Sequence, residues 1–158
     1  IEKPNDWTKE VKKNESINGT QQQRYAYWVA FEDFAFQNAQ FAKNFNRRKP
    51  STDHWMNFSV GSSACHIAVS QIQKRDELVV ELYINENKEL FRSLLQHKDD
   101  IEAIAGFSFD WRELPEKKAS RIVVQKSAAL SNQSKWSEQF EWLIDVMLKM
   151  KSGFKKYL

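Results

Sequence analysis

The sequence predicts an α+β fold in which an antiparallel sheet of about five strands is covered mainly on one face by helices. Segments with helical and strand periodicity occur in the order α-β-β-β-α-β-β-α, without the regular βαβ alternation of a doubly wound dinucleotide fold. Only four Gly and three Pro occur among 158 residues, too few for the many tight turns of a β-sandwich. A 41% hydrophobic and 13% aromatic composition indicates a well-packed core.

The length suits one domain. We assign residues 21–158 to a single α+β domain and the polar residues 1–20 to a linker or N-terminal tail. The chain begins with Ile1 instead of Met, which fits either a domain excised from a longer protein or a processed terminus.

The first predicted element is a long amphipathic helix over residues 21–45. Aromatic residues recur at helical spacing along it: Tyr27, Phe31, Phe34, Phe41 and Phe45. The helix should end before Pro50, because the residue before a proline is disfavoured in the helical region. Basic residues Arg47, Arg48 and Lys49 would then lie at its C-terminus, where the helix dipole favours cations.

Three consecutive strands follow, over residues 54–59, 64–73 and 77–84. If Lys74-Arg75 forms a two-residue turn, Ile67 pairs with Leu82, and the apolar side chains share one face. This apolar face consists of Cys65, Ile67, Val69, Leu78, Val80, Leu82 and Ile84. On the other face, His66 lies opposite Tyr83, Ala68 opposite Glu81 and Ser70 opposite Val79.

The second half begins with a predicted helix over residues 85–105, with Leu90, Leu94, Ile101 and Ile104 as its buried stripe and Gly106 as its end. Strands over residues 107–113 and 119–125 follow, joined by a loop at 114–118.

A final helix begins at Ser134 or Lys135. Its apolar residues form a seven-residue repeat: Trp136, Phe140, Leu143, Met147, Met150, Phe154 and Tyr157. This stripe fits packing within the chain or against another protomer.

Composition excludes several classes of protein. A single cysteine, Cys65, cannot form an internal disulfide, which is typical of the reducing cytoplasm. No apolar run approaches the ~18 residues of a transmembrane helix, so we expect no membrane partner. No metal-ligand spacing or phosphate-binding loop is present, and we expect no cofactor. Glu116-Lys117-Lys118 resembles one end of a PD-(D/E)XK nuclease motif, but it follows Pro115 in a loop instead of lying on a strand.

Two groups of residues are candidate sites. His66, Glu81 and Tyr83 share one sheet face and lie within contact distance across the strands. A carboxylate beside an imidazole can orient it as a general base. No nucleophile is evident nearby, however, and a polar outer sheet face, or a buried hydrogen-bonded trio under a helix, explains these residues more simply.

The second group is basic and aromatic: Arg47, Arg48, Lys49, Trp55, Lys117, Lys118 and Arg121. Cations of this kind contact phosphates while an aromatic ring stacks on a base. The alternative is an ordinary charged surface with Trp55 in the core. The net charge of +3 is mild.

Several segments together resemble a known family. They are Tyr27-Trp28-Val29-Ala30-Phe31, Arg48-Lys49-Pro50, His54-Trp55, Phe58-Ser59-Val60-Gly61, Val80-Glu81-Leu82-Tyr83-Ile84, Lys117-Lys118-Ala119-Ser120-Arg121-Ile122 and the stretch from Trp136 to Trp142. In this order they resemble the bacterial domain-of-unknown-function family DUF 4268 over almost the whole chain. Where this chain has Ser62-Ser63-Ala64-Cys65, related sequences tend to have an Arg and an aromatic residue, which weakens a phosphate contact at that turn.

The resemblance implies a C-terminal domain that often follows a PD-(D/E)XK nuclease-like domain, with no catalytic residues known. We therefore expect a non-catalytic accessory domain that contacts DNA or RNA or positions a nuclease domain. The alternative is a protein-interaction or dimerisation module that uses the final helix, and a third hypothesis is an enzyme that uses His66 and Glu81.

Overall fold

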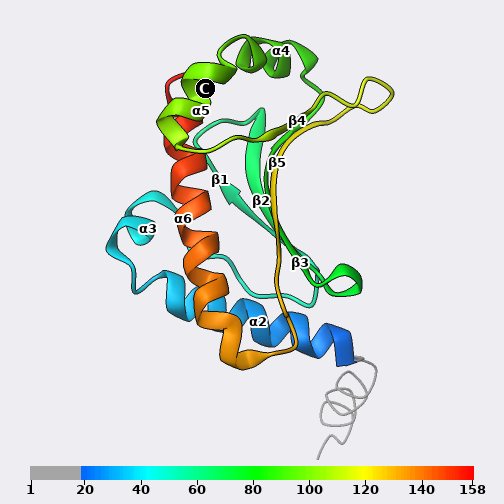
Figure 1. Ribbon diagram of the computed structural model, residues 1–158, viewed down its shortest axis with the longest axis vertical. Coiled ribbons are helices and arrows are strands. Elements are labelled where there is room, and N and C mark those ends of the chain that lie inside the picture. The colour runs from blue at the N-terminus through cyan, green and yellow to red at the C-terminus, as the bar shows by residue number, and fades with distance from the viewer. Residues whose placement is uncertain (1–18) are drawn as a thin grey trace, which may run out of the picture.

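A five-stranded antiparallel sheet with strand order β1-β2-β3-β5-β4 forms the centre of the computed structural model, which describes residues 19–158 (Figure 1). The strands are β1 (Trp55–Ser59), β2 (Cys65–Ile72), β3 (Glu77–Ile84), β4 (Asp110–Arg112) and β5 (Ser120–Ser127). The helices of the described part are α2 (Gly19–Ala35), α3 (Ala39–Asn44), α4 (Lys88–Gln96), α5 (Lys98–Ala105) and α6 (Trp136–Lys155). The α+β class is confirmed. Of the expected tail at residues 1–20, positions 1–18 lie outside the described residues.

The predicted register of β2 and β3 is confirmed. Ile67 pairs with Leu82 and His66 with Tyr83, so the apolar set faces the core as expected. The connection differs from the two-residue turn, because Gln73–Arg75 form a short 3-10 helix and Asp76 adopts a left-handed conformation with φ 45°. The same register is obtained from a longer loop.

The first predicted helix is two helices. A break at residues 36–38 separates α2 from α3, and the Asn38 side chain accepts a hydrogen bond from the Phe41 N–H at 3.0 Å. Such capping by Asn begins a new helix. The apolar spacing hid the break, because Phe34 and Phe41 remain seven residues apart across it.

The second predicted helix is also divided, into α4 and α5 at His97. This change of direction turns Ile104 outward, where 46% of it is exposed, and Phe91 is buried instead, so the predicted stripe was wrong at Ile104. Gly106 ends α5 with φ 89°, as predicted.

Strand β4 is shorter than the predicted segment 107–113, because residues of this segment donate hydrogen bonds to a side chain of α5 instead of pairing with β5. The Glu102 carboxylate accepts from the Phe109 backbone N–H at 2.8 Å and from the Trp111 indole at 2.9 Å. Phe109 also packs on Phe154 of α6. The residues before Asp110 therefore attach to helices and not to β5.

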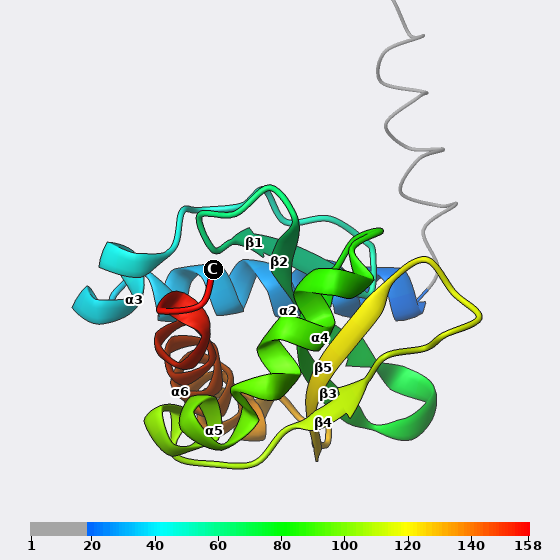
Figure 2. The ribbon, with the colours of Figure 1, turned by 90° about the horizontal axis from the view of Figure 1, so that it is seen from above.

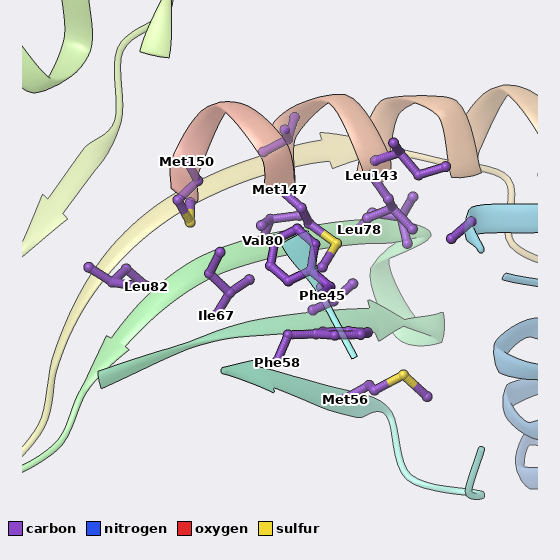
Figure 3. Packing of buried hydrophobic residues seen from close by; sticks show 14 of the residues in the cluster. Phe45, Met56, Phe58, Ile67, Leu78, Val80, Leu82, Leu143, Met147 and Met150 are labelled. Atoms are coloured by element: carbon purple, nitrogen blue, oxygen red, sulfur yellow. The ribbon is translucent and has the colours of Figure 1, made fainter. Parts of the chain in front are cut away.

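Helices cover one face of the sheet. In both views, α3, α5 and α6 lie on the same side of it (Figures 1 and 2). Tyr27 of α2 packs edge-on against Trp136 and Phe140 at the start of α6. The stripe of α6 faces the strands, with Leu143 and Met147 fully buried (Figure 3). The seven-residue repeat of α6 thus packs against the sheet of the same chain.

Between residues 19 and 158, no helix combines the length and the apolar composition that crossing a bilayer requires.

Candidate functional site

The second face of the sheet has no helix over it in the described part of the chain (Figure 1). A cavity of about 540 Å³ lies on this face. Both candidate groups contribute to its lining, namely Trp55, His66, Glu81, Tyr83, Lys117 and Arg121. Residues from β1, β2, β3, β5 and the β4–β5 loop thus meet at one place.

Strand register explains why these side chains meet. Tyr83 of β3 pairs with His66 of β2 on one side and with Arg121 of β5 on the other. Since alternate residues of a strand share a face, Glu81 lies on the same face two positions from Tyr83. The rings of His66 and Tyr83 stack, with centroids 5.2 Å apart and planes 28° from parallel.

Glu81 and Arg121 form a bidentate ion pair within the cavity. Arg121 Nη2 donates to Glu81 Oε1 at 2.9 Å, and Arg121 Nε donates to Glu81 Oε2. Only 5% of Glu81 is exposed. The hydrogen bond to this carboxylate raises the pKa of Arg121. The pair fixes the plane of the guanidinium. An Arg side chain has five N–H donors, and those of Arg121 that do not bond to Glu81 make no other hydrogen bond to residues 19–158.

The His66 imidazole is not arranged as a general base. Burial lowers its pKa, and the charge of Glu81 offsets only part of that effect. Within the described residues, the Glu81 carboxylate bonds to Arg121 and not to His66. His66 therefore contributes an aromatic ring stacked on Tyr83.

Trp55 lies at the edge of the cavity on the edge strand β1. Its side chain is 44% exposed, an unusual state for the largest apolar residue. The preceding segment is held in place, because the Trp28 indole donates to the Asp53 carbonyl at 2.8 Å. The alternative interpretation, in which Trp55 belongs to the core, is wrong.

The β4–β5 loop, residues 113–119, forms another wall of the cavity and contains Lys117. Its conformation is fixed by Lys88 at the start of α4, whose ammonium donates to the carbonyls of Leu114 at 2.8 Å and Ala119 at 2.9 Å and to the Ser120 hydroxyl at 3.1 Å. Leu114 itself has φ 55°. Sequence reasoning missed Lys88, because a lysine in a first helical turn gives no sign of being enclosed by a loop 25 residues later.

The structure divides the predicted basic group. Trp55, Lys117 and Arg121 line the cavity, whereas Lys118 lies beside it and pairs with Glu86 at 3.6 Å. The basic triplet lies against the helical layer instead. The Arg47 guanidinium stacks on Phe36, and the Arg48 backbone N–H donates to Glu32 of α2 at 3.0 Å. Lys49 follows in the same segment.

Among residues 19–158, no cluster of three or more His, Cys, Asp or Glu side chains has an arrangement that could hold a metal ion. The chemistry of this face is therefore built from rings, one ion pair and a loop lysine.

Comparisons with known proteins give one result. Neither the curated proteins nor the solved structures include a match to this chain. A family model described as a domain of unknown function, DUF4268, matches residues 23–158, which include every element from α2 to α6. This match spans most of the chain, and the resemblance stated above is confirmed. The chain belongs to the DUF4268 family.

Proposed function

We propose that the helix-free face of the sheet binds nucleic acid and that the domain is a non-catalytic binding module. The observation that supports this most is the half-exposed Trp55 at the edge of a cavity that also contains Arg121 and Lys117. An exposed aromatic ring beside cations is the combination that stacks on bases and contacts phosphates.

A binding role fits the chemistry of the face better than catalysis. The carboxylate of Glu81 is engaged by Arg121 and forms no hydrogen bond to His66 in the described residues, so it does not orient the imidazole as a base. An acid–base mechanism needs a group free to accept or donate a proton at the substrate. A fixed guanidinium whose remaining N–H groups have no hydrogen-bond partner among residues 19–158 is instead suited to recognising an anion.

The biological setting is part of the same proposal. We propose that the domain acts as a bacterial accessory domain near a nuclease domain, where it holds nucleic acid or positions that domain. This part of the proposal rests on what the family resemblance implies, namely that such a domain often follows a nuclease-like domain. Self-association through the apolar stripe of α6 is less favoured, because Leu143 and Met147 of that stripe are buried within the chain.

The test is fluorescence anisotropy with labelled single-stranded and duplex DNA at low and at moderate salt. Binding is expected at low salt and should weaken as salt rises, because phosphate contacts release counterions. Trp55→Ala and Lys117→Ala should each weaken it.

Two substitutions elsewhere serve as matched controls. Tyr25→Ala removes an aromatic side chain that is 50% exposed on α2, and Lys98→Ala removes an exposed cation at the start of α5. Both should bind as the wild type does. No binding at low salt, or equal losses in the controls, would contradict the proposal.

A further inference from the structure

We infer that the cavity accepts an unpaired nucleotide of a single strand and not the surface of a duplex. This inference rests on the proposed function and specifies the kind of nucleic acid that the face selects. Three features of the face support it: its free ring, its limited positive charge and its hollow shape.

The free ring of Trp55 requires a base with an accessible face. In a duplex each base face is covered by its neighbours, whereas unpaired bases can stack on an aromatic side chain. Trp55 is 44% exposed and lies on an edge strand, so a planar group can reach it from solvent. The stacked rings of His66 and Tyr83 form a second aromatic wall on the adjacent strands.

The charge on this face suits few phosphates. Arg121 is neutralised in part by Glu81, and Lys118 lies 3.6 Å from Glu86. Lys117 forms no ion pair within residues 19–158, so it provides the main uncompensated charge at the cavity. A duplex presents the phosphates of two strands, and a duplex-binding protein can contact about 6–10 of them. One or two phosphates of a single strand match the cations present here.

The shape of the site is that of a pocket for one projecting group. Its volume of about 540 Å³ lies within the range of small-ligand pockets. Its polar floor has both kinds of hydrogen-bonding group, because Arg121 retains free donors and the Glu81 oxygens retain acceptor sites beyond those used. A base edge presents donors and acceptors together, and a base extruded from a strand would place them on this floor.

The experiment compares one oligonucleotide of about 12 residues as a single strand and as its duplex, within the range of known single-strand site sizes. The single strand should bind at least about tenfold more tightly than the duplex. Its affinity should fall with salt at a log–log slope of about −0.7 to −1.4, as one or two phosphate contacts on a single strand predict. Trp55→Ala should weaken single-strand binding about tenfold or more, and Trp55→Phe should retain most of it.

The outcomes separate this inference from the proposed function. Equal affinity for duplex and single strand, or an equal effect of Trp55→Ala on both, would overturn the single-strand inference while nucleic-acid binding stands. No binding of either DNA would overturn both. Circular dichroism of Trp55→Ala and Trp55→Phe checks that each variant is folded. If Trp55→Ala does not fold, the ratio of single-strand to duplex affinity of the wild type decides the result.

Discussion

The two members of the Glu81–Arg121 pair have unequal surroundings. Glu81 is almost fully buried, whereas about a third of the Arg121 side chain remains in contact with solvent. Removing a partner from a buried charge is costly, because the remaining charge has lost both its water and its counterion. An exposed guanidinium that loses its partner is instead hydrated.

Substitution of the pair should therefore give asymmetric losses of stability. We expect Arg121→Gln to lower the free energy of unfolding by roughly 2–4 kcal/mol, and Glu81→Gln to lower it by about 1 kcal/mol or less. The double variant should resemble Glu81→Gln. Denaturant unfolding of the three variants measures these differences, and equal losses in the two single variants would contradict the explanation.

Glu32 of α2 is a second buried carboxylate, and it lies away from the cavity. One oxygen accepts the Arg48 N–H, while Oε2 is buried and has no hydrogen-bond partner in the described part of the chain. Burial raises the pKa of Glu32 above its ordinary value of 4.5, against the opposing effects of the Arg48 hydrogen bond and the charges of Arg47 and Arg48. The folded state thus favours the protonated form.

This raised pKa predicts a pH-dependent difference between Glu32→Gln and the wild type. Below about pH 4 the carboxyl is protonated in both folded and unfolded chains and has no electrostatic cost. As the pH rises through the raised pKa, the wild type loses stability and Glu32→Gln does not, so the variant should gain relative stability toward neutral pH. Denaturation at several pH values tests this, with Glu141→Gln as the matched control for removal of one exposed carboxylate.

Residues of the candidate site differed in how far the sequence could place them. The facing positions of His66 and Tyr83 followed from one hairpin, since apolar burial permits a single register there. The partner of Glu81 did not follow. Arg121 reaches β3 only after two helices and a further strand, so no local turn sets the register of that pairing. As a result, the sequence suggested that Glu81 contacts His66, whereas in the structure the Glu81 carboxylate bonds to Arg121.

At the scale of elements, the β4–β5 loop depends on α4 through one ammonium group. Lys88 bonds to oxygens at both ends of the loop, including the carbonyls of Leu114 and Ala119. Because Leu114 adopts a left-handed conformation that is costly for a side chain with a Cβ, the loop needs such external support. Lys117 would otherwise lack a fixed position at the cavity.

Lys88→Met should release this loop. We expect a loss of about 1–3 kcal/mol in stability, because several part-buried oxygens lose their donor. We also expect faster hydrogen exchange at the Lys117 amide, which bonds to the Leu114 carbonyl at 2.9 Å. Lys98→Met is a matched control, since Lys98 is also the first residue of its helix but is exposed. If the hydrogen-exchange rate of the Lys117 amide is unchanged in Lys88→Met, the β4–β5 loop keeps its conformation without Lys88 and the explanation is wrong.

Helix boundaries were the elements that the sequence predicted least well. Both predicted long helices are broken where an apolar pattern continues across a change of direction, as between Phe34 and Phe41. Periodicity records which side of the chain is buried and not whether its axis is straight. Asn38 and Asn87, which cap α3 and α4, were the available signals of a new helix start.

At the scale of the whole molecule, the core lies between one sheet face and the helices, and α6 is its longest contact. The side chains of Leu143, Met147 and Met150 point toward Ile67, Val80 and Leu82 of the sheet (Figure 3). The cavity lies on the opposite sheet face, where Val79 and Glu81 are each only 5% exposed and Trp55 at the edge is 44% exposed. The arrangement therefore connects the stability of the fold with the accessibility of the candidate site.

Leu143→Ala tests whether the stripe acts within one chain. The side chain is fully buried, so its truncation should leave a cavity and lower the free energy of unfolding by roughly 2–4 kcal/mol. Leu148→Ala on the same helix is only partly buried and should lose less. Because the contacts are within the chain, both losses should be independent of protein concentration in denaturant unfolding, and light scattering should give the same mass for wild type and variants. A concentration-dependent unfolding midpoint that Leu143→Ala abolishes would instead indicate an interface between protomers.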